Sequence, residues 1–527
     1  MILKSQSNGH LIIPILIIFL FLALMINFYD FEPGIDQIRQ MSWANSLNQS
    51  EYFISRELIK EKGLMYNDEK SFLVNLIKTG YSDIGHLFNL TVIIILYLLN
   101  LIFSNEIIVF NTVSIFCFSL NTYFVILIYE LYFNDNTKDH IINKILIFIS
   151  IVPSYYLLFS PLGSHNISVF FLLLSFYYLK KYENDPKLLI FNLLIIFSSL
   201  SIFSHKINTV TLPILIFFSL IINKKYKETA IYSFVTLIIL LPIFFIITLK
   251  PETLSASNKF ANLEFSLIGY INNFFIFFKN IFLTIGPIFL VFFVFGLVKF
   301  LSNFVIYKNF LIFIFTFLVL CVFVNDFQKY YIRSNLYINY FVILIALFTI
   351  FNLRNKINAR LRNILTVLII LNAFLNLIPN KKINLYNNYY SKLYSEYYNN
   401  NGKLSNSLIK IEKNFGDQDS LIYLDNKIQD YTKIYIKSVY NKNKIQIKPL
   451  KNLIGNQINQ TKLEIDFYKK NIFLISMEQS LGEISAIIAK ININEIFSCK
   501  VKSTNIFKMK NVNPINDNLY LNKVECI

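Results

Sequence analysis

Charged residues are scarce in this sequence. They make up 15% of the 527 residues, whereas about 25% is usual in a soluble globular domain. Hydrophobic residues account for 55%, and apolar runs of about 17–25 residues recur over the first three-quarters of the chain. Such runs are too long for the strands of a membrane barrel, and a segment in lipid must satisfy its own backbone hydrogen bonds. The composition therefore predicts a polytopic α-helical membrane protein.

Cysteine is also rare, with four residues in the chain. No CxxC pair and no cluster of His and Cys occurs in the sequence, which argues against a zinc site. Cys117 and Cys321 lie in apolar runs, where a thiol is most simply a core side chain. Cys499 and Cys526 lie in the tail. A disulfide between them is one alternative and requires an extracytoplasmic tail; two free thiols are the other.

Two patterns that would indicate other functions are missing from the sequence. Residues 380–527 contain no glycine-rich loop of the phosphate-binding kind. The chain has no internal repeat, and charges within its apolar runs are scarce. Transporters often consist of two related halves and need intramembrane charges for coupling. The missing repeat and the scarce intramembrane charges weigh against a transporter or flippase of lipid-linked glycans, although that class remains an alternative.

The net charge of +17 would suit nucleic acid, but the positions of the basic residues argue otherwise. Lys and Arg lie in short loops between apolar runs and in the tail. This distribution is typical of residues that set membrane orientation and contact anionic headgroups. We therefore expect the lipid bilayer, and no nucleic acid, as a partner.

The apolar runs predict about eleven membrane spans. The first covers residues 11–29, follows Lys4 and lacks a convincing cleavage site, so we expect a retained anchor. The others are expected at residues 107–133, 144–161, 167–181, 187–204, 207–222, 230–249, 285–302, 310–324, 336–352 and 363–379.

The run at residues 86–104 decides the orientation. If it dips into the membrane without crossing, the most basic loops, such as 223–227 and 354–362, all lie in the cytoplasm together with the N-terminus. If it crosses, these loops face outward, against the usual bias of positive charge. The bias favours the dip and an outward tail. We expect an integral protein of the bacterial inner membrane.

Three polar stretches interrupt this pattern. Residues 30–86 are expected to form a long outward loop that contains a surface-lying helix around Trp43. The outward loop 250–284 carries an aromatic stripe and predicts a second surface-lying helix. Residues 380–527 have short apolar runs at 420–425, 471–476 and 504–509, which predict buried strands of a soluble extracytoplasmic α/β domain. The domain boundary is therefore expected at residues 379/380.

Carboxylates in the first outward loop are the candidates for catalysis. Asp36, just past the first span, could take the proton from an attacking acceptor hydroxyl; equally, it could be an acid favoured by a helix N-terminus. Asp83 and His86, just before the dip, could bind a metal, position an acceptor or shuttle a proton. A polar cap on the dipping helix is the plainer interpretation of that pair.

Two further turns on the same side carry candidates for substrate binding. His165 and Asn166 are expected between two spans, where such a pair most often forms hydrogen bonds within the turn. Lys206 is expected in a tight turn, where a charge near hydrocarbon usually has a partner. A lipid-linked phosphate is one candidate, since an ammonium stabilises charge on a departing phosphate; snorkelling to headgroups is the alternative. His205 either assists Lys206 or caps the turn.

Together these residues resemble the GT-C class of membrane glycosyltransferases, in the branch of protein O-mannosyltransferases and lipid A aminoarabinose transferases. Asp36 matches the family's early acidic residue, and His86 resembles its His-Pro-Pro-like entry to a juxtamembrane helix. The likeness extends over residues 10–225 and is carried by GIDQIRQMSWANSL, GHLFNLTVIIILYLLNLIFS, SHNISVFFLLLSFYYLKKY and SIFSHKINTVTLP. Leu87 and Phe88 replace the two prolines, and His165–Asn166 stands where an acidic residue is expected.

The resemblance implies transfer of a sugar from a polyprenyl-phosphate-linked donor to a glycan, lipid or protein acceptor outside the cytoplasm, usually with inversion. Asp36 would be the base and Lys206 would meet the lipid phosphate. A divalent metal ion is the one cofactor left open. A polysaccharide polymerase or ligase is the nearest alternative enzyme, and a non-catalytic assembly protein is the alternative outside enzymes and transporters.

Overall fold

The structure is a computed structural model in which part of the chain is described. The described residues are 3–28, 40, 44, 89–103, 106–133, 140–152, 163–249, 267–323, 326–377, 420–424, 446–449, 471–477, 481–482, 485–486, 489, 492, 501–512 and 517–526. Nearly all of the polar loop 30–86 lies outside this set, including Asp36, Asp83 and His86. The chain divides into two compact units, Met1–Phe31 with Leu73–Leu393 and Glu32–Phe72 with Tyr394–Ile527.

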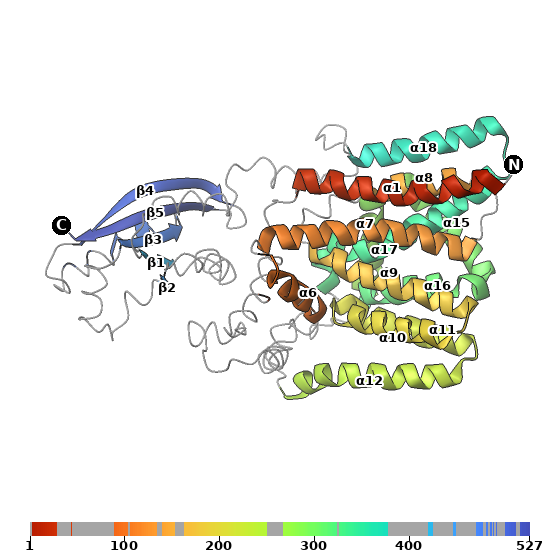
Figure 1. The fold of residues 1–527 in the computed structure, drawn as a ribbon, viewed down its shortest axis with the longest axis horizontal. Helices are drawn as coiled ribbons and strands as arrows, with labels where there is room; N and C mark the ends of the chain where they lie inside the picture. Colours follow the sequence, from red (N-terminus) through yellow and green to blue (C-terminus); the bar gives the residue numbers. More distant parts are fainter. Residues whose placement is uncertain are drawn as a thin grey trace. The chain divides into compact units, whose positions relative to one another are not determined.

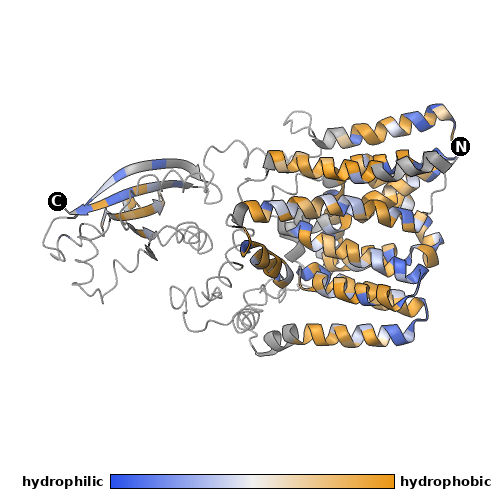
Figure 2. Ribbon diagram, viewed as in Figure 1, coloured by the Kyte–Doolittle hydropathy of each residue, from blue (hydrophilic) through white to orange (hydrophobic). Residues whose placement is uncertain are grey.

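The described part of the first unit consists of helices and the short turns between them (Figure 1). Hydrophobic residues cover most of their length, and hydrophilic residues occur mainly toward their ends (Figure 2). The helices are α1 (Leu3–Phe28), α6 (Leu90–Asn100), α7 (Glu106–Phe133), α8 (His140–Ile151), α9 (Gly163–Asn184), α10 (Leu188–Ile202), α11 (Lys206–Ile222), α12 (Tyr226–Leu249), α14 (Leu267–Ile285), α15 (Pro287–Ser302), α16 (Phe304–Phe323), α17 (Asp326–Arg354) and α18 (Ala359–Leu377).

Three described segments are long and apolar enough to cross a membrane: Ile108–Phe133 in α7, Phe304–Val322 in α16 and Tyr337–Arg354 in α17. The expectation of about eleven spans is therefore wrong for the described part of the chain. Six shorter apolar segments contain 10–17 residues. At about 1.5 Å per residue they measure about 15–26 Å, less than the roughly 30 Å of a bilayer core. An apolar run in the sequence does not guarantee a helix of spanning length.

Helix α6 occupies the centre of the run that was expected to dip. It contains 11 residues, with Asn89 as its N-cap and Leu101 as its C-cap. A helix of this length is about 16 Å long, which is too short to cross a bilayer. The dip itself stays a prediction.

Aromatic side chains hold α7, α15, α16 and α17 together. Phe133 of α7 stacks on Phe348 of α17, with ring centroids 4.0 Å apart. Phe300 of α15 stacks on Tyr307 of α16 at the same separation of 4.0 Å. Phe310 contacts both stacks through Phe133 and Phe300. This cluster is one continuous core at the ends of four helices.

The aromatic stripe of the loop 250–284 lies in α14. This helix packs against α16 and α17. Phe277 is buried, whereas Phe275 is 65% exposed. The predicted helix is present, and one of its faces packs onto the other helices of the unit.

The described part of the second unit contains a five-stranded sheet in the order β2-β1-β3-β5-β4. The strands β1 (Ser420–Leu424), β2 (Gln446–Pro449) and β3 (Asn471–Met477) are parallel, and β4 (Val501–Val512) and β5 (Asp517–Cys526) form an antiparallel pair that joins β3. Every residue from Ile472 to Met477 is buried, as is typical of a central strand covered on both faces. The three apolar runs predicted to be strands coincide with β1, β3 and β4.

Candidate functional site

The first turns of α9 and α11 lie side by side, although α10 separates these helices in the sequence. Ser168 Oγ donates a hydrogen bond to Ser204 O at 2.7 Å, and Asn208 Nδ2 donates to Ser168 O at 3.1 Å. Because α10 runs back between them, α9 and α11 are parallel and their N-termini meet at one end of the unit (Figure 1). The fold therefore brings the two histidine-bearing turns together.

His165, His205 and Tyr337 contact one another, and we call them the histidine site. The ring centroids of His165 and His205 are 4.5 Å apart, with an angle of 64° between the ring planes. The Tyr337 ring stacks on His205 at 4.9 Å and 20°. Its hydroxyl lies 2.8 Å from Nδ1 of His165. A single tyrosine therefore contacts both imidazoles.

His205 is the N-cap of α11. Its Nδ1 accepts a hydrogen bond from the backbone N–H of Ile207 at 3.3 Å, so the neutral ring carries its proton on Nε2. Burial lowers the pKa of His205 well below its usual value, and the neighbouring His165 and Lys206 lower it further. The positive end of the helix dipole also disfavours an imidazolium at this position. At neutral pH the site therefore contains a neutral imidazole.

Asn166 belongs to the contact between α9 and α7. Its Nδ2 donates to Ser114 Oγ at 3.3 Å, and its backbone oxygen accepts from Asn121 Nδ2 at 3.0 Å. Asn166 and Asn121 are both fully buried. The two residues of the predicted pair therefore contact different helices: His165 contacts α17, and Asn166 contacts α7. This packing favours a structural role for Asn166.

Lys206 is the first residue of α11 and follows directly on His205. It is partly exposed. Its ammonium therefore belongs to the same end of the unit as the histidine site. The N-terminal backbone N–H groups of α11 and of α9 lie at this end as well, and such groups favour anions.

The first turn of α6 is attached beside the histidine site. The Thr91 N–H donates to Phe203 O at 3.1 Å, and Thr91 Oγ1 donates to Leu200 O at 2.8 Å. These acceptors lie at the end of α10, immediately before His205. Asp83 and His86 precede α6 in the sequence and lie outside the described residues. The structure therefore shows that α6, the helix after these two residues, lies beside the histidine site. The roles of Asp83, His86 and Asp36 stay predictions.

Tyr337 is the residue of this site that the sequence did not single out. It is fully buried and is separated from His165 by 172 residues. It lies in an apolar, aromatic-rich run and is one of 33 tyrosines in the chain. Its neighbours in the sequence carry no polar pattern that would distinguish it.

The described part of the site does not fit a metal centre. Among the described residues no group of three or more His, Cys, Asp or Glu side chains is arranged to hold a metal ion. Nδ1 of His165 faces the Tyr337 hydroxyl, and Nδ1 of His205 accepts from the helix backbone. Two imidazoles without a third protein ligand fall short of the usual coordination by three or four ligands.

We compared the chain with known protein families and with curated proteins. No model of a known protein family matches the chain, and no curated protein matches it significantly in sequence.

Proposed function

We propose that the chain is a membrane glycosyltransferase of GT-C-like architecture that takes a sugar from a polyprenyl-phosphate-linked donor. The observation that carries the proposal is the contact of His165 with His205 at a ring separation of 4.5 Å, next to Lys206. These two turns carry candidates for substrate binding that were expected on the same side of the membrane, and they lie together at adjacent helix N-termini.

The physical basis is the electrostatics of this end of the helical unit. Two helix N-termini, the Lys206 ammonium and a neutral His205 make the surroundings suitable for a phosphate. During transfer the acceptor oxygen forms a bond to the anomeric carbon, and the bond from that carbon to the lipid phosphate oxygen breaks. The phosphate leaves with the electron pair, so a nearby cation stabilises the transition state. Asp36 is the proposed base that takes the acceptor proton.

The attachment of α6 supports a place near this site for the end of the first polar loop, which carries Asp83 and His86. His86 is three residues from Asn89, the N-cap of α6, and a chain of three residues extends at most about 11 Å. In this proposal Asp83 and His86 meet the acceptor or a metal ion. The site faces the extracytoplasmic side, as the positive charge of the opposite loops favours, and the apolar tail of the donor lies among the helices.

Transfer from a labelled donor pool tests this function. Membranes that contain the full chain are incubated with radiolabelled polyprenyl-phosphate sugars, and label in the acceptor fraction is measured. Asp36→Asn is expected to reduce transfer by about 10²–10⁴-fold, and Lys206→Gln is expected to reduce it as well. Lys187→Gln is the control, because Lys187 is 71% exposed and pairs with Asp185 outside the site.

Two outcomes would contradict the proposal. If no donor in the pool is consumed by membranes with the wild-type chain, the proposed reaction is wrong. If transfer occurs but Lys206→Gln behaves like the control, the phosphate is bound elsewhere. Products that grow in length with time would assign the activity to the polymerase alternative.

A further inference from the structure

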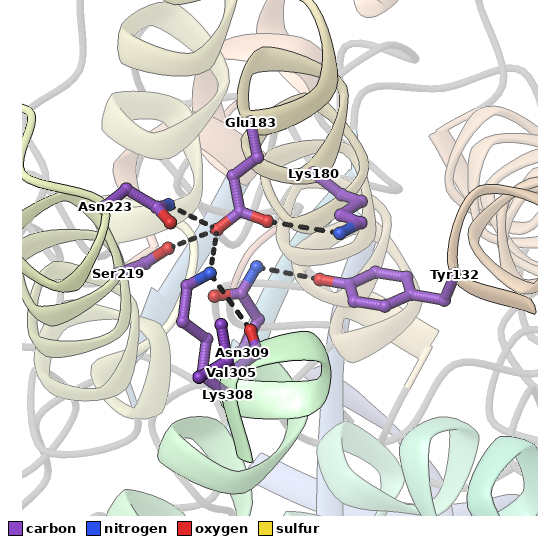
Figure 3. A network of polar contacts seen from close by, with 8 residues as sticks. All are labelled: Tyr132, Lys180, Glu183, Ser219, Asn223, Val305, Lys308 and Asn309. Atoms are coloured by element: carbon purple, nitrogen blue, oxygen red, sulfur yellow. Dashed lines mark hydrogen bonds and ion pairs between the residues drawn. The ribbon is translucent and has the colours of Figure 1, made fainter. Parts of the chain in front are cut away.

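A second polar cluster surrounds Glu183, in the last turn of α9 (Figure 3). One oxygen of its carboxylate, Oε1, accepts from Ser219 Oγ at 2.7 Å and from Asn223 Nδ2 at 2.8 Å. The same oxygen lies 3.2 Å from Lys308 Nζ, and Oε2 lies 3.5 Å from Lys180 Nζ. We call these five residues the Glu183 cluster. It lies at the end of α9 opposite to the histidine site, about 27 Å along the helix.

The cluster contains one negative and two positive side chains. Lys308 comes from α16 and is 5% exposed, Glu183 is 7% exposed, and Lys180 is 14% exposed. Lys308 also donates to Val305 O at 3.4 Å, and Lys180 lies 4.7 Å from the centroid of the Tyr132 ring. These contacts are neutral. The described side chains of the cluster therefore leave one positive charge without a balancing carboxylate.

The other described carboxylates at this end have partners of their own. Glu130 pairs with Lys144. Glu228 accepts from the Tyr182 hydroxyl at 2.9 Å. Asp185 pairs with Lys187 at 2.7 Å. Within the described part of the chain, no carboxylate outside the cluster is paired with Lys180 or Lys308.

An unbalanced charge in poorly hydrated surroundings is costly, and an anion from outside the protein removes that cost. Phosphate is the abundant anion in the headgroup region of a membrane, and basic side chains are attracted to it. Lys180 is the more exposed of the two lysines and is the one placed to meet it. A lysine presents three N–H donors, more than Lys180 uses on Glu183.

We propose that the Glu183 cluster binds a phosphate group, either that of an anionic lipid headgroup or free phosphate, with Lys180 as its principal contact. Glu183 lowers the affinity of this site by neutralising one of the two lysines and holds both ammonium groups in place. The site is separate from the proposed sugar-transfer site and does not depend on that function.

The test uses the full chain in an uncharged detergent and follows thermal unfolding. A thiol-reactive dye reports unfolding, because Cys117 and Cys321 are buried. Short-chain phosphatidylglycerol, phosphatidylcholine and inorganic phosphate are added separately. Phosphatidylglycerol is expected to raise the unfolding temperature of the wild type more than phosphatidylcholine, whose headgroup has no net charge. Inorganic phosphate distinguishes a free anion from a lipid: a shift with it that matches phosphatidylglycerol assigns the site to the free anion.

The variants make the test specific to the cluster. Lys180→Gln is expected to lose most of the shift, whereas Lys187→Gln, which alters an exposed pair, keeps it. Glu183→Gln is expected to bind phosphatidylglycerol about tenfold more tightly, since an opposing charge a few ångströms away is removed. A Glu183→Gln chain that is destabilised remains informative, because the anion should rescue it.

Three results would overturn the proposal. The first is an equal response to phosphatidylglycerol and phosphatidylcholine combined with no response to phosphate. The second is a Lys180→Gln variant that responds like the wild type. The third is a destabilised Glu183→Gln variant that no anion rescues, which would make the cluster a purely structural ion pair.

Discussion

The rings of His205 and Tyr337 are stacked, with centroids 4.9 Å apart and planes 20° from parallel. The contact joins the turn before α11 to the middle of α17. Because Tyr337 also bonds His165 through its hydroxyl, it fixes the positions of both imidazoles. This geometry makes the tyrosine the residue on which the shape of the histidine site depends most.

Removing the hydroxyl of Tyr337 tests this dependence. Tyr337→Phe keeps the stacking on His205 and deletes the hydrogen bond to His165, so we expect a loss of about 1 kcal/mol in the free energy of unfolding. Tyr340→Phe is the matched control. Tyr340 is buried on the same helix, and its hydroxyl lies near Asn121 without a hydrogen bond of standard length and angle. Denaturation in detergent should show the control near the wild type; equal losses would refute a role for the Tyr337 hydroxyl.

The stability of the helical unit should depend on the charge of His205. Its pKa lies below the ordinary value of 6.5, so as the pH falls through this value the unfolded chain takes up a proton before the folded one. Stability is therefore complete above about pH 6.5 and decreases below it. His205→Asn retains a good N-cap acceptor and cannot titrate. Unfolding temperatures measured between about pH 5 and 8 should fall less steeply in this variant; an identical slope would exclude His205 as the source.

Breaking the buried ion pair of Glu183 should be costly. Glu183→Ala leaves Lys308 and Lys180 without their carboxylate, and we expect a loss of about 3–5 kcal/mol, the usual cost of removing one partner of a buried pair. Asp185→Ala serves as the control, because Asp185 and Lys187 are 47% and 71% exposed. Changes at such exposed pairs stay within about 1 kcal/mol. Similar losses for both variants would show that the Glu183 cluster contributes no special stability.

Acid should weaken the same cluster in a separate pH range. Burial raises the pKa of Glu183, but Lys308, the Ser219 hydroxyl, Lys180 and Asn223 outweigh it, so the pKa lies below its ordinary value of 4.5. The stabilisation is present above this value and is lost as the pH falls through the lower folded pKa. Glu183→Gln removes this acid transition; a wild-type loss that persists in the variant must come from other carboxylates.

A side chain at Gly296 should separate α15 from α17. A Cβ atom there would lie 2.5 Å from Ile345 Cγ2 and 2.5 Å from Thr349 Oγ1. Small residues permit such close approach between membrane helices, so Gly296→Ala should cost about 1–3 kcal/mol through overpacking. Val298→Ala, on the same helix and 64% exposed, should stay within about 0.5 kcal/mol. A neutral Gly296→Ala would show that the two helices can move apart freely.

The positions of most helices could be predicted, because an apolar run is a local property of the chain. The run predicted at 107–133 is α7, Glu106–Phe133, and the run predicted at 207–222 is α11, Lys206–Ile222. Their ends were less predictable. α17 begins at Asp326 rather than near 336, and α18 begins at Ala359 rather than near 363. Polar residues such as Asp326 and Arg360 do not prevent a helix from extending beyond its apolar run.

Part of the candidate site was also visible in the sequence. Histidine and lysine at the ends of apolar runs are unusual enough to single out His165, His205 and Lys206. Their convergence followed from an alternation of up and down helices, which the parallel arrangement of α9 and α11 reproduces. The separation of Asn166 from His165 was not predictable, because it depends on which neighbour each side of α9 meets.

A helical, membrane-type chain could be predicted from the amino-acid sequence, since burial of apolar runs and the backbone's need for internal hydrogen bonds permit little else. The sequence also indicated which turns carry titratable groups. The contact of Tyr337 with His165, 172 residues away, and the pairing of Lys308 of α16 with Glu183 of α9 follow from the tertiary fold. Such pairs depend on the rotation and register of packed helices, which arise from side chains distant in the sequence.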